Sequence, residues 1–214
     1  MACYDANAQS KKKGKEPELA ISKRGNLIFE DDFSGKELEW VQTDGEWRIF
    51  RDALVPKLAK EGVKYAGTEH PFDKTANIVI QLRALLAPGS GVSIGASAKT
   101  SALSPHVMVR TNTHVMAFIY LDETGATQDI APKVFTYPKA RWMTLILERL
   151  ARDYAFTLDG KTIRYQVEDG DIPPYDRLRI TLYNFAIGPC AIDDVKVWEA
   201  LPKDEGPEKD KKKK

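Results

Sequence analysis

Long apolar runs and cysteine pairs are both missing from this sequence. Its 214 residues contain no stretch of about 18 apolar side chains, the length that a membrane-spanning helix needs. Cys3 and Cys190 are far apart, so a disulfide framework is not expected. Lys and Arg (32) balance Asp and Glu (31) to a net charge of +1, which indicates neither nucleic acid nor an anionic membrane as a partner. A globular domain remains, because 43% apolar residues are enough for a core.

Common catalytic motifs are missing as well. There is no G-x-S-x-G nucleophile motif, and the glycines near residue 90 lie between expected strands, with no following helix to form a phosphate loop. Of the histidines, His106 and His114 are expected on different strands and form no metal-ligand pair. The sequence therefore does not identify a reaction.

Both ends of the chain are polar and basic. Residues 1–25 and 202–214 have the composition of disordered segments, which predicts one folded domain over residues 26–201. Their lysines could hold an acidic polymer or surface, although solvated tails are the simpler interpretation. Ala6-Asn7-Ala8 has the small-x-small pattern of a signal-peptidase site, but no basic or apolar region precedes it. It is either the remnant of a leader or a chance match.

Short extended segments follow one another between these ends. In residues 27–33 apolar side chains recur at alternate positions, and after the Asp44-Gly45 turn an extended apolar pattern resumes. Asp159-Gly160 is the expected turn of a hairpin. Further strands are expected at residues 78–86, 92–98, 106–112, 114–122, 141–150, 154–160, 162–168, 177–185 and 191–199. So many antiparallel strands, with no helix, predict an all-β, two-sheet jelly-roll sandwich in which the segments 27–33 and 191–199 lie side by side.

Several motifs resemble a known superfamily. They are DDF, a tryptophan eight residues on, W-x-I-x-x-x-A-L, EHPF, ARWMTLILE, LDGK and IDDVKVWE. They resemble the concanavalin A-like lectin/glucanase superfamily, in particular the 3-keto-disaccharide hydrolase-like group of secreted bacterial proteins. The resemblance covers about residues 27–200. It implies a concanavalin A-like fold, a carbohydrate partner and a secreted or periplasmic location. Glucanases of the superfamily carry carboxylates at alternate positions of one strand, and this sequence has no such run.

Two aspartates are candidate metal ligands. Alternation places Asp31 on the face of Leu27, Phe29 and Phe33, and Asp193 on the face of Val195 and Val197. Because a buried carboxylate must be compensated, the pair suggests a structural Ca²⁺. In the alternative interpretation they accept backbone N–H bonds or meet an arginine such as Arg51, or a β-bulge turns one outward.

Outward side chains on the expected strands suggest a ligand site. If the strands are neighbours on a concave sheet, the face would suit a sugar or a uronate, because aromatic rings stack on sugar rings and guanidinium groups bind hydroxyls or carboxylates. The ligand-binding candidates are Gln81, Arg83, His106, Arg110 and Tyr183, and the expected strand 177–185 also turns Arg179 and Thr181 outward. An ordinary solvated sheet face is the alternative.

Three functions stay open at this point. The first is an exported carbohydrate-binding domain. The second, implied by the resemblance, is a glycoside hydrolase or lyase acting on 3-keto-disaccharides, with His106 as a base and Arg83 and Arg110 holding the substrate. The third is a structural or surface-tethered protein that binds through its basic tails.

Overall fold

The computed structural model describes residues 16–35, 37–57, 65–96, 106–110, 115–121, 127–135, 140–167, 174–183 and 188–203. The described residues form fifteen strands and no helix, so none of them offers an apolar helix that could cross a membrane. The strands are β1 (Ser22–Asp31), β2 (Val41–Asp44), β3 (Trp47–Ile49), β4 (Leu54–Pro56), β5 (Tyr65–Thr75), β6 (Ile78–Leu86), β7 (Gly91–Ala96), β8 (His106–Arg110), β9 (Val115–Leu121), β10 (Thr127–Val134), β11 (Arg141–Leu150), β12 (Asp153–Leu158), β13 (Lys161–Gln166), β14 (Tyr175–Tyr183) and β15 (Ala191–Pro202).

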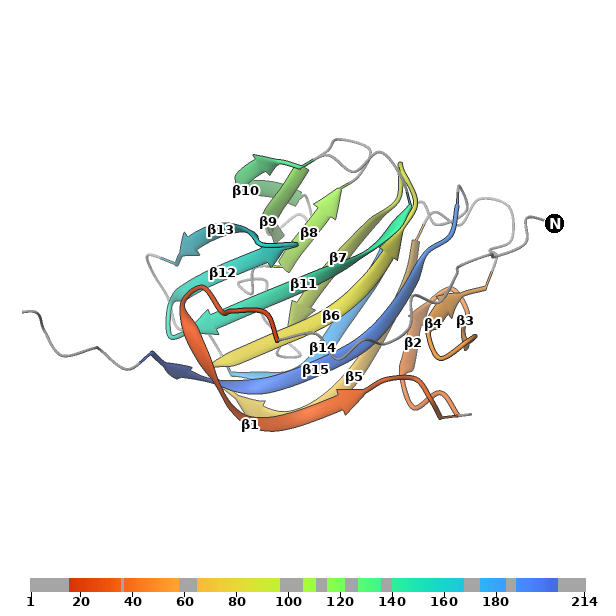
Figure 1. Ribbon diagram of the computed structural model, residues 1–214, viewed down its shortest axis with the longest axis horizontal. Helices are drawn as coiled ribbons and strands as arrows, with labels where there is room; N and C mark the ends of the chain where they lie inside the picture. The colour runs from red at the N-terminus through yellow and green to blue at the C-terminus, as the bar shows by residue number, and fades with distance from the viewer. Residues whose placement is uncertain are drawn as a thin grey trace, which may run out of the picture.

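The strands form two antiparallel sheets, which confirms the predicted jelly-roll sandwich. Sheet A has the order β13-β12-β11-β6-β15-β4-β3, with β1 also paired to β15. Sheet B has the order β10-β9-β8-β7-β14-β5-β2. In Figure 1 the sheet A strands β6 and β15 lie in front of β14 of sheet B, and β11 crosses in front of β7. Each sheet therefore has an inner face toward the other sheet and an outer face away from it.

Period-two alternation places the apolar core between the sheets. Ile80 and Leu82 on β6, and Ile180 and Leu182 on β14, have no exposed surface and belong to one large cluster. Burial of one such side chain stabilises the folded state by about 1.5–3 kcal/mol, so residues of this kind hold the two sheets together.

The first and last strands are neighbours, as predicted. Phe29 pairs with Val197 and Asp31 with Val195 along the antiparallel β1–β15 ladder. Asp159, at φ 45°, and Gly160, at φ 79°, form the predicted turn between β12 and β13.

The folded domain begins earlier than the predicted boundary at residue 26. Residues 16–21, called the strap below, run back across β11 and β6 before β1 begins at Ser22 (Figure 1). Leu19 is 5% exposed and packs against Ile146 and Trp198. The prediction of a disordered segment was therefore wrong for residues 16–25, while residues 1–15 and 204–214 lie outside the described residues.

A buried carboxylate holds the strap in place. Glu148 of β11 has no exposed surface. It accepts hydrogen bonds from the backbone N–H groups of Ala20 (2.7 Å), Ile21 (3.0 Å) and Ser22 (2.9 Å), and from the Ser22 hydroxyl (2.8 Å). Such bonds to an ionised acceptor are stronger than neutral ones. They fix a polar segment that composition alone describes as disordered.

The sequence analysis missed three strands, β2, β5 and β10. Gly67 and Pro71 interrupt the alternation of β5, and Ala131, at φ 49°, with Pro132 interrupts that of β10. The Asp44-Gly45 turn does join two strands, but β2 lies in sheet B and β3 in sheet A.

Candidate functional site

The five predicted ligand-binding residues do not share one face. Gln81 and Arg83 lie on β6 of sheet A, whereas His106, Arg110 and Tyr183 lie on β8 and β14 of sheet B. Alternation along a strand groups residues by face, but it does not determine which sheet the strand joins. The side chains of His106 and Arg110 lie outside the described part of the protein, so only their register is known.

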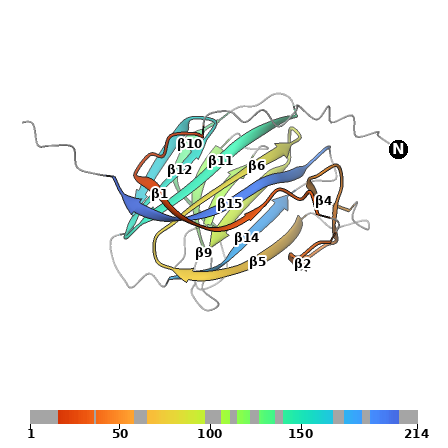
Figure 2. The same cartoon turned by 60° about the horizontal axis from the view of Figure 1, so that its bottom comes forward.

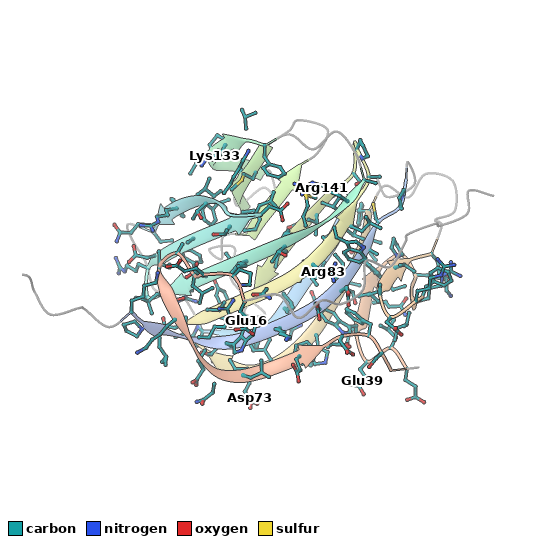
Figure 3. The ribbon with its side chains drawn as sticks, viewed as in Figure 1. Glu16, Glu39, Asp73, Arg83, Lys133 and Arg141 are labelled. Carbon is teal, nitrogen blue, oxygen red and sulfur yellow. The ribbon has the colours of Figure 1, made fainter. Side chains whose placement is uncertain are left out.

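The two residues in sheet A contact other side chains of the same sheet. Gln81 Oε1 accepts a hydrogen bond of 2.7 Å from Arg24 Nη2. The Arg83 guanidinium lies 5.0 Å from the centroid of the Trp142 ring, on the near sheet of Figure 3. These contacts tie β6 to β1 and β11.

The predicted inward direction of Asp193 was wrong. A β-bulge follows it in β15, where Asp194 has a φ of 50°. The extra residue shifts the alternation, so Asp193 lies opposite Arg83 and not on the face of Val195. Asp193 Oδ1 accepts a hydrogen bond from the Asp194 N–H (2.7 Å), and Oδ2 lies 3.6 Å from Arg83 Nη1. Of the alternatives, the bulge and the arginine partner both occur.

Asp31 points inward, as predicted, and both of its carboxylate oxygens accept hydrogen bonds. Oδ1 accepts one from the Phe33 N–H (2.7 Å), and Oδ2 accepts one from Trp40 Nε1 (2.8 Å). Among the described residues, no group of three or more His, Cys, Asp or Glu side chains could hold a metal ion. The contacts of both aspartates are those of the hydrogen-bonded interpretation, and calcium binding stays a prediction.

The outer face of sheet B offers a different polar surface. Because Ile180 and Leu182 of β14 are buried in the core, Arg179, Thr181 and Tyr183 lie on the outer face. Their partners on β5 are Glu69, Gly67 and Tyr65, respectively. Figure 2 shows β14 and β5 side by side.

Charged side chains cover one half of this face. Glu69 contacts Arg177 Nη1 through Oε2 (3.2 Å) and Arg179 Nε through Oε1 (3.8 Å). Asp44 Oδ2 of β2 lies 3.6 Å from Arg179 Nη2, and Asp176 pairs with Arg177. Hydrogen bonds to Asp176 and Glu69 raise the pKa of Arg177, so this group stays a cation. These five residues are called the charged cluster below.

Gly67 makes room for one member of this cluster. It pairs with Asp44 across β2 and β5. A Cβ atom at Gly67 would lie 2.5 Å from Thr43 Oγ1 and 3.2 Å from Asp44 Oδ2. A residue without a side chain therefore lets the Asp44 carboxylate lie over β5 toward Arg179.

We expect Gly67→Ala to disturb the face more than the fold. The new methyl group displaces Thr43 and Asp44, which costs about 1 kcal/mol of stability because the Thr43 side chain can rotate away. Thermal unfolding measures this cost. Gly35→Ala is the matched control, since no atom lies within 4 Å of a Cβ there. Equal melting temperatures for the two variants would contradict the crowding at Gly67.

Tyrosines and hydroxyl groups make up the other half of the face. Tyr65 is 47% exposed and lies directly opposite Tyr183, which is half-buried. Thr181 and Ser93 pair across β14 and β7, and each is 8% exposed. The face therefore has a floor of small hydroxyl side chains, with two aromatic rings on one side and the charged cluster on the other.

Sequence reasoning identified part of this face. It placed Arg179, Thr181 and Tyr183 outward on one strand, but it missed Glu69 and Tyr65 because β5 was not recognised as a strand. In the sequence Glu69 stands out only as part of the motif EHPF, and Pro71 in that motif interrupts the alternation that would indicate a strand.

His70 lies on the inner face of β5, and folding lowers the pKa of its side chain. Its ring stacks on Phe29 at a centroid distance of 3.9 Å and lies 5.4 Å from the Trp40 ring. Its Nδ1 atom is buried without a hydrogen-bond partner among the described residues. Burial lowers the pKa of His70, although the nearby backbone of Pro71 and the charges of Asp31 and Glu39 oppose the shift.

Acid should therefore destabilise the protein through His70. Below a pH of about 6.5 the unfolded chain binds a proton that the folded His70 resists, so this stability is present above that pH and is lost as the pH falls toward the lower folded value. Melting temperatures measured from pH 7.5 to 5.0 should fall less steeply for His70→Phe than for the wild type. Parallel curves would show that the site is not coupled to folding.

Comparisons with known proteins agree with the architecture. No protein-family model and no curated protein matches the sequence. A Bacillus subtilis protein of unknown function with a galectin-like fold has a TM-score of 0.63 at 11% identity, covering 86% of this chain and 100% of that chain. Carbohydrate binding module CBM66 of Bacillus subtilis has a TM-score of 0.54 at 12% identity, covering 76% and 93%. A laminarinase from Flavobacterium sp. UMI-01 has a TM-score of 0.59 at 16% identity, covering 81% and 100%.

The TM-scores show a shared fold, while the identities of 11–16% are too low to show a shared function. The chain shares its jelly-roll fold with a protein described as galectin-like in fold, with a carbohydrate binding module and with a laminarinase. The predicted relation to the 3-keto-disaccharide hydrolase-like group is not confirmed.

Proposed function

We propose that the protein is an exported carbohydrate-binding domain that recognises a sugar or a uronate on the outer face of sheet B. The observation that carries the proposal is the pairing of Tyr65 with Tyr183 beside the charged cluster, across the floor of Thr181 and Ser93. A sugar offers an apolar ring face and a rim of hydroxyl groups, and this surface has complements for both.

The chemistry of the face matches that of a saccharide in detail. An exposed ring such as Tyr65 provides apolar area for the C–H face of a sugar. The guanidinium of Arg179 has donors in a fixed fork, and Asp44 and Glu69 supply acceptors beside it. A cluster of donors and acceptors that already hold each other in place loses little entropy when it binds hydroxyl groups.

Similar folds support a carbohydrate partner. Solved structures with this jelly roll are described as a carbohydrate binding module, a laminarinase and a β-glucanase of Bacillus licheniformis. Since such a fold hosts both binding and hydrolysis, the face itself must discriminate between them.

The face favours binding over hydrolysis of 3-keto-disaccharides. Glycosidases of the glucanase type use two carboxylates held at a defined separation on one strand. Here Asp44 and Glu69 come from two strands, and both contact Arg179. His106, the other candidate base, lies on β8, and its side chain is outside the described residues. An activity screen on keto-disaccharides tests the enzymatic alternative.

We expect Arg179→Ala to weaken glycan binding by about 1–3 kcal/mol, the contribution of a hydrogen bond to a charged group. A glycan array with neutral and uronate-containing ligands would identify a ligand, and calorimetry would then measure the affinity. Arg48→Ala is the matched control, because Arg48 is exposed on β3 of sheet A, where its guanidinium lies 5.3 Å from the centroid of the Phe50 ring. Loss of binding in both variants, or in neither, would contradict the proposed face.

A further inference from the structure

A groove of about 570 Å³ lies on the outer face of sheet A, on the other side of the sandwich from the proposed glycan face. One wall is the strap, and the other is the hairpin of β12 and β13. Its volume falls within the range of about 300–1,000 Å³ that is typical of small-molecule sites. In Figure 3 the labelled Glu16 marks the start of the strap in front of sheet A.

The strap wall is fixed at several points. Glu148 binds three successive backbone N–H groups of residues 20–22. From the C-terminal end of the domain, Lys203 Nζ donates to the carbonyl of Leu19 (2.6 Å), and Arg164 Nη2 of β13 donates to the carbonyl of Ala20 (3.2 Å). A wall held in this way is preorganised, so a ligand does not have to order it.

The floor combines an apolar centre with hydroxyl groups. Ile146 of β11 is 1% exposed and lines the groove with Thr144. Thr157 and Thr162 face each other across β12 and β13 with their hydroxyl oxygens 2.8 Å apart. At the end of the groove, Asp159 accepts a hydrogen bond from the backbone N–H of Thr144 (2.9 Å). A ligand would therefore meet an apolar surface bordered by groups that both donate and accept.

The described lining carries balanced charge. Glu18 and Asp159 contribute two carboxylates, and Arg164 and Lys203 contribute two cations. Asp159 is also paired with Arg141, an exposed side chain that does not line the groove and whose charge is screened by water. An ionic ligand would lose its hydration without a net opposite charge to replace it. An uncharged ligand needs no opposite charge to compensate for its loss of hydration.

We infer that this groove is a second binding site, for an uncharged, hydroxyl-rich small molecule of the size of a monosaccharide or disaccharide. The threonine hydroxyls and Arg164 donate to its oxygens, Glu18 and Asp159 accept from its hydroxyl groups, and Pro17 with the threonine methyl groups contacts its apolar side. The inference does not require the face on sheet B to bind anything, because no residue of that face lines the groove.

Chemical-shift titration of the full chain tests the site directly. Maltose, cellobiose and lactose serve as uncharged probes, and glucuronate serves as the acidic one. The Ile146 methyl groups and the Thr144 amide report the groove, while the Gly67 and Tyr183 amides report the sheet B face. We expect an uncharged probe to shift the groove signals, whether or not the signals of the other face move. Absence of groove shifts with every uncharged probe, or equal affinity for glucuronate, would overturn the inference.

Two variants confirm where the probe binds. Thr144→Val keeps the shape of the side chain but loses the hydroxyl, and we expect affinity at the groove to fall about 2- to 10-fold, the effect of one neutral hydrogen bond. Thr162→Trp fills the groove and should abolish the shifts. Thr75→Val, on β5, removes a threonine hydroxyl outside the groove and should leave the affinity unchanged. Unchanged groove affinity in a folded Thr162→Trp variant, verified by its melting curve, would rule out binding in the groove.

Discussion

Glu148→Ala is expected to release the strap and to lower the free energy of unfolding by about 2–4 kcal/mol. The substitution removes the acceptor of four hydrogen bonds, three of them from backbone N–H groups. A buried donor left without a partner costs about 1–3 kcal/mol. The strap avoids part of this cost by leaving the sheet, which exposes the apolar surface around Leu19 to water.

Urea unfolding and amide hydrogen exchange measure the two parts of this effect. Exchange at Ala20, Ile21 and Ser22 should accelerate much more than the global loss of stability predicts. Glu148→Gln should have a smaller effect, because one acceptor oxygen remains while an NH₂ group faces the strap amides. Glu30→Ala removes the same charge from an exposed position of β1 and is the control. If it destabilises the protein as much as Glu148→Ala does, the carboxylate does not hold the strap.

Trp47→Ala is expected to have the largest effect on stability, about 3–5 kcal/mol. The side chain is 2% exposed within the main core. Its Nε1 donates a hydrogen bond of 2.9 Å to the carbonyl of Gly67, which joins β3 of sheet A to β5 of sheet B. The substitution therefore opens a cavity and also removes a link between the sheets. Because Gly67 lies under the charged cluster, glycan affinity should fall as well.

Chemical denaturation distinguishes the packing from the hydrogen bond. Trp47→Phe fills most of the cavity but leaves the Gly67 carbonyl without its donor, so we expect a loss of about 1–2 kcal/mol. Tyr65→Ala removes an aromatic side chain from an exposed position of β5 and should cost less than about 1 kcal/mol. A loss for Trp47→Ala no larger than that of Tyr65→Ala would show that the indole does not join the sheets.

Features that depend only on residues close together in the chain could be predicted from the sequence alone. Alternation along β6 and β14 is set by the pleat of each strand, so the inward positions of Ile80 and Ile180 follow from the sequence without any partner strand. The Asp159-Gly160 turn depends only on the two residues that must adopt a positive φ. The all-β class and the two-sheet architecture follow because so many strands of this kind cannot form one open sheet.

The tertiary structure decided everything that depends on which strands meet. Gln81 and Tyr183 share the same outward pattern, yet they lie in different sheets, because strand pairing is a long-range choice that alternation does not encode. One extra residue at Asp194 turned Asp193 to the other face, since a bulge shifts a period of two. The strap looks disordered in composition, but Glu148, 128 residues from Ala20 in the chain, accepts hydrogen bonds from the N–H groups of Ala20 and Ile21. The residues of each candidate binding surface are far apart in the chain and come together only on folding. No local sequence motif therefore predicts either surface.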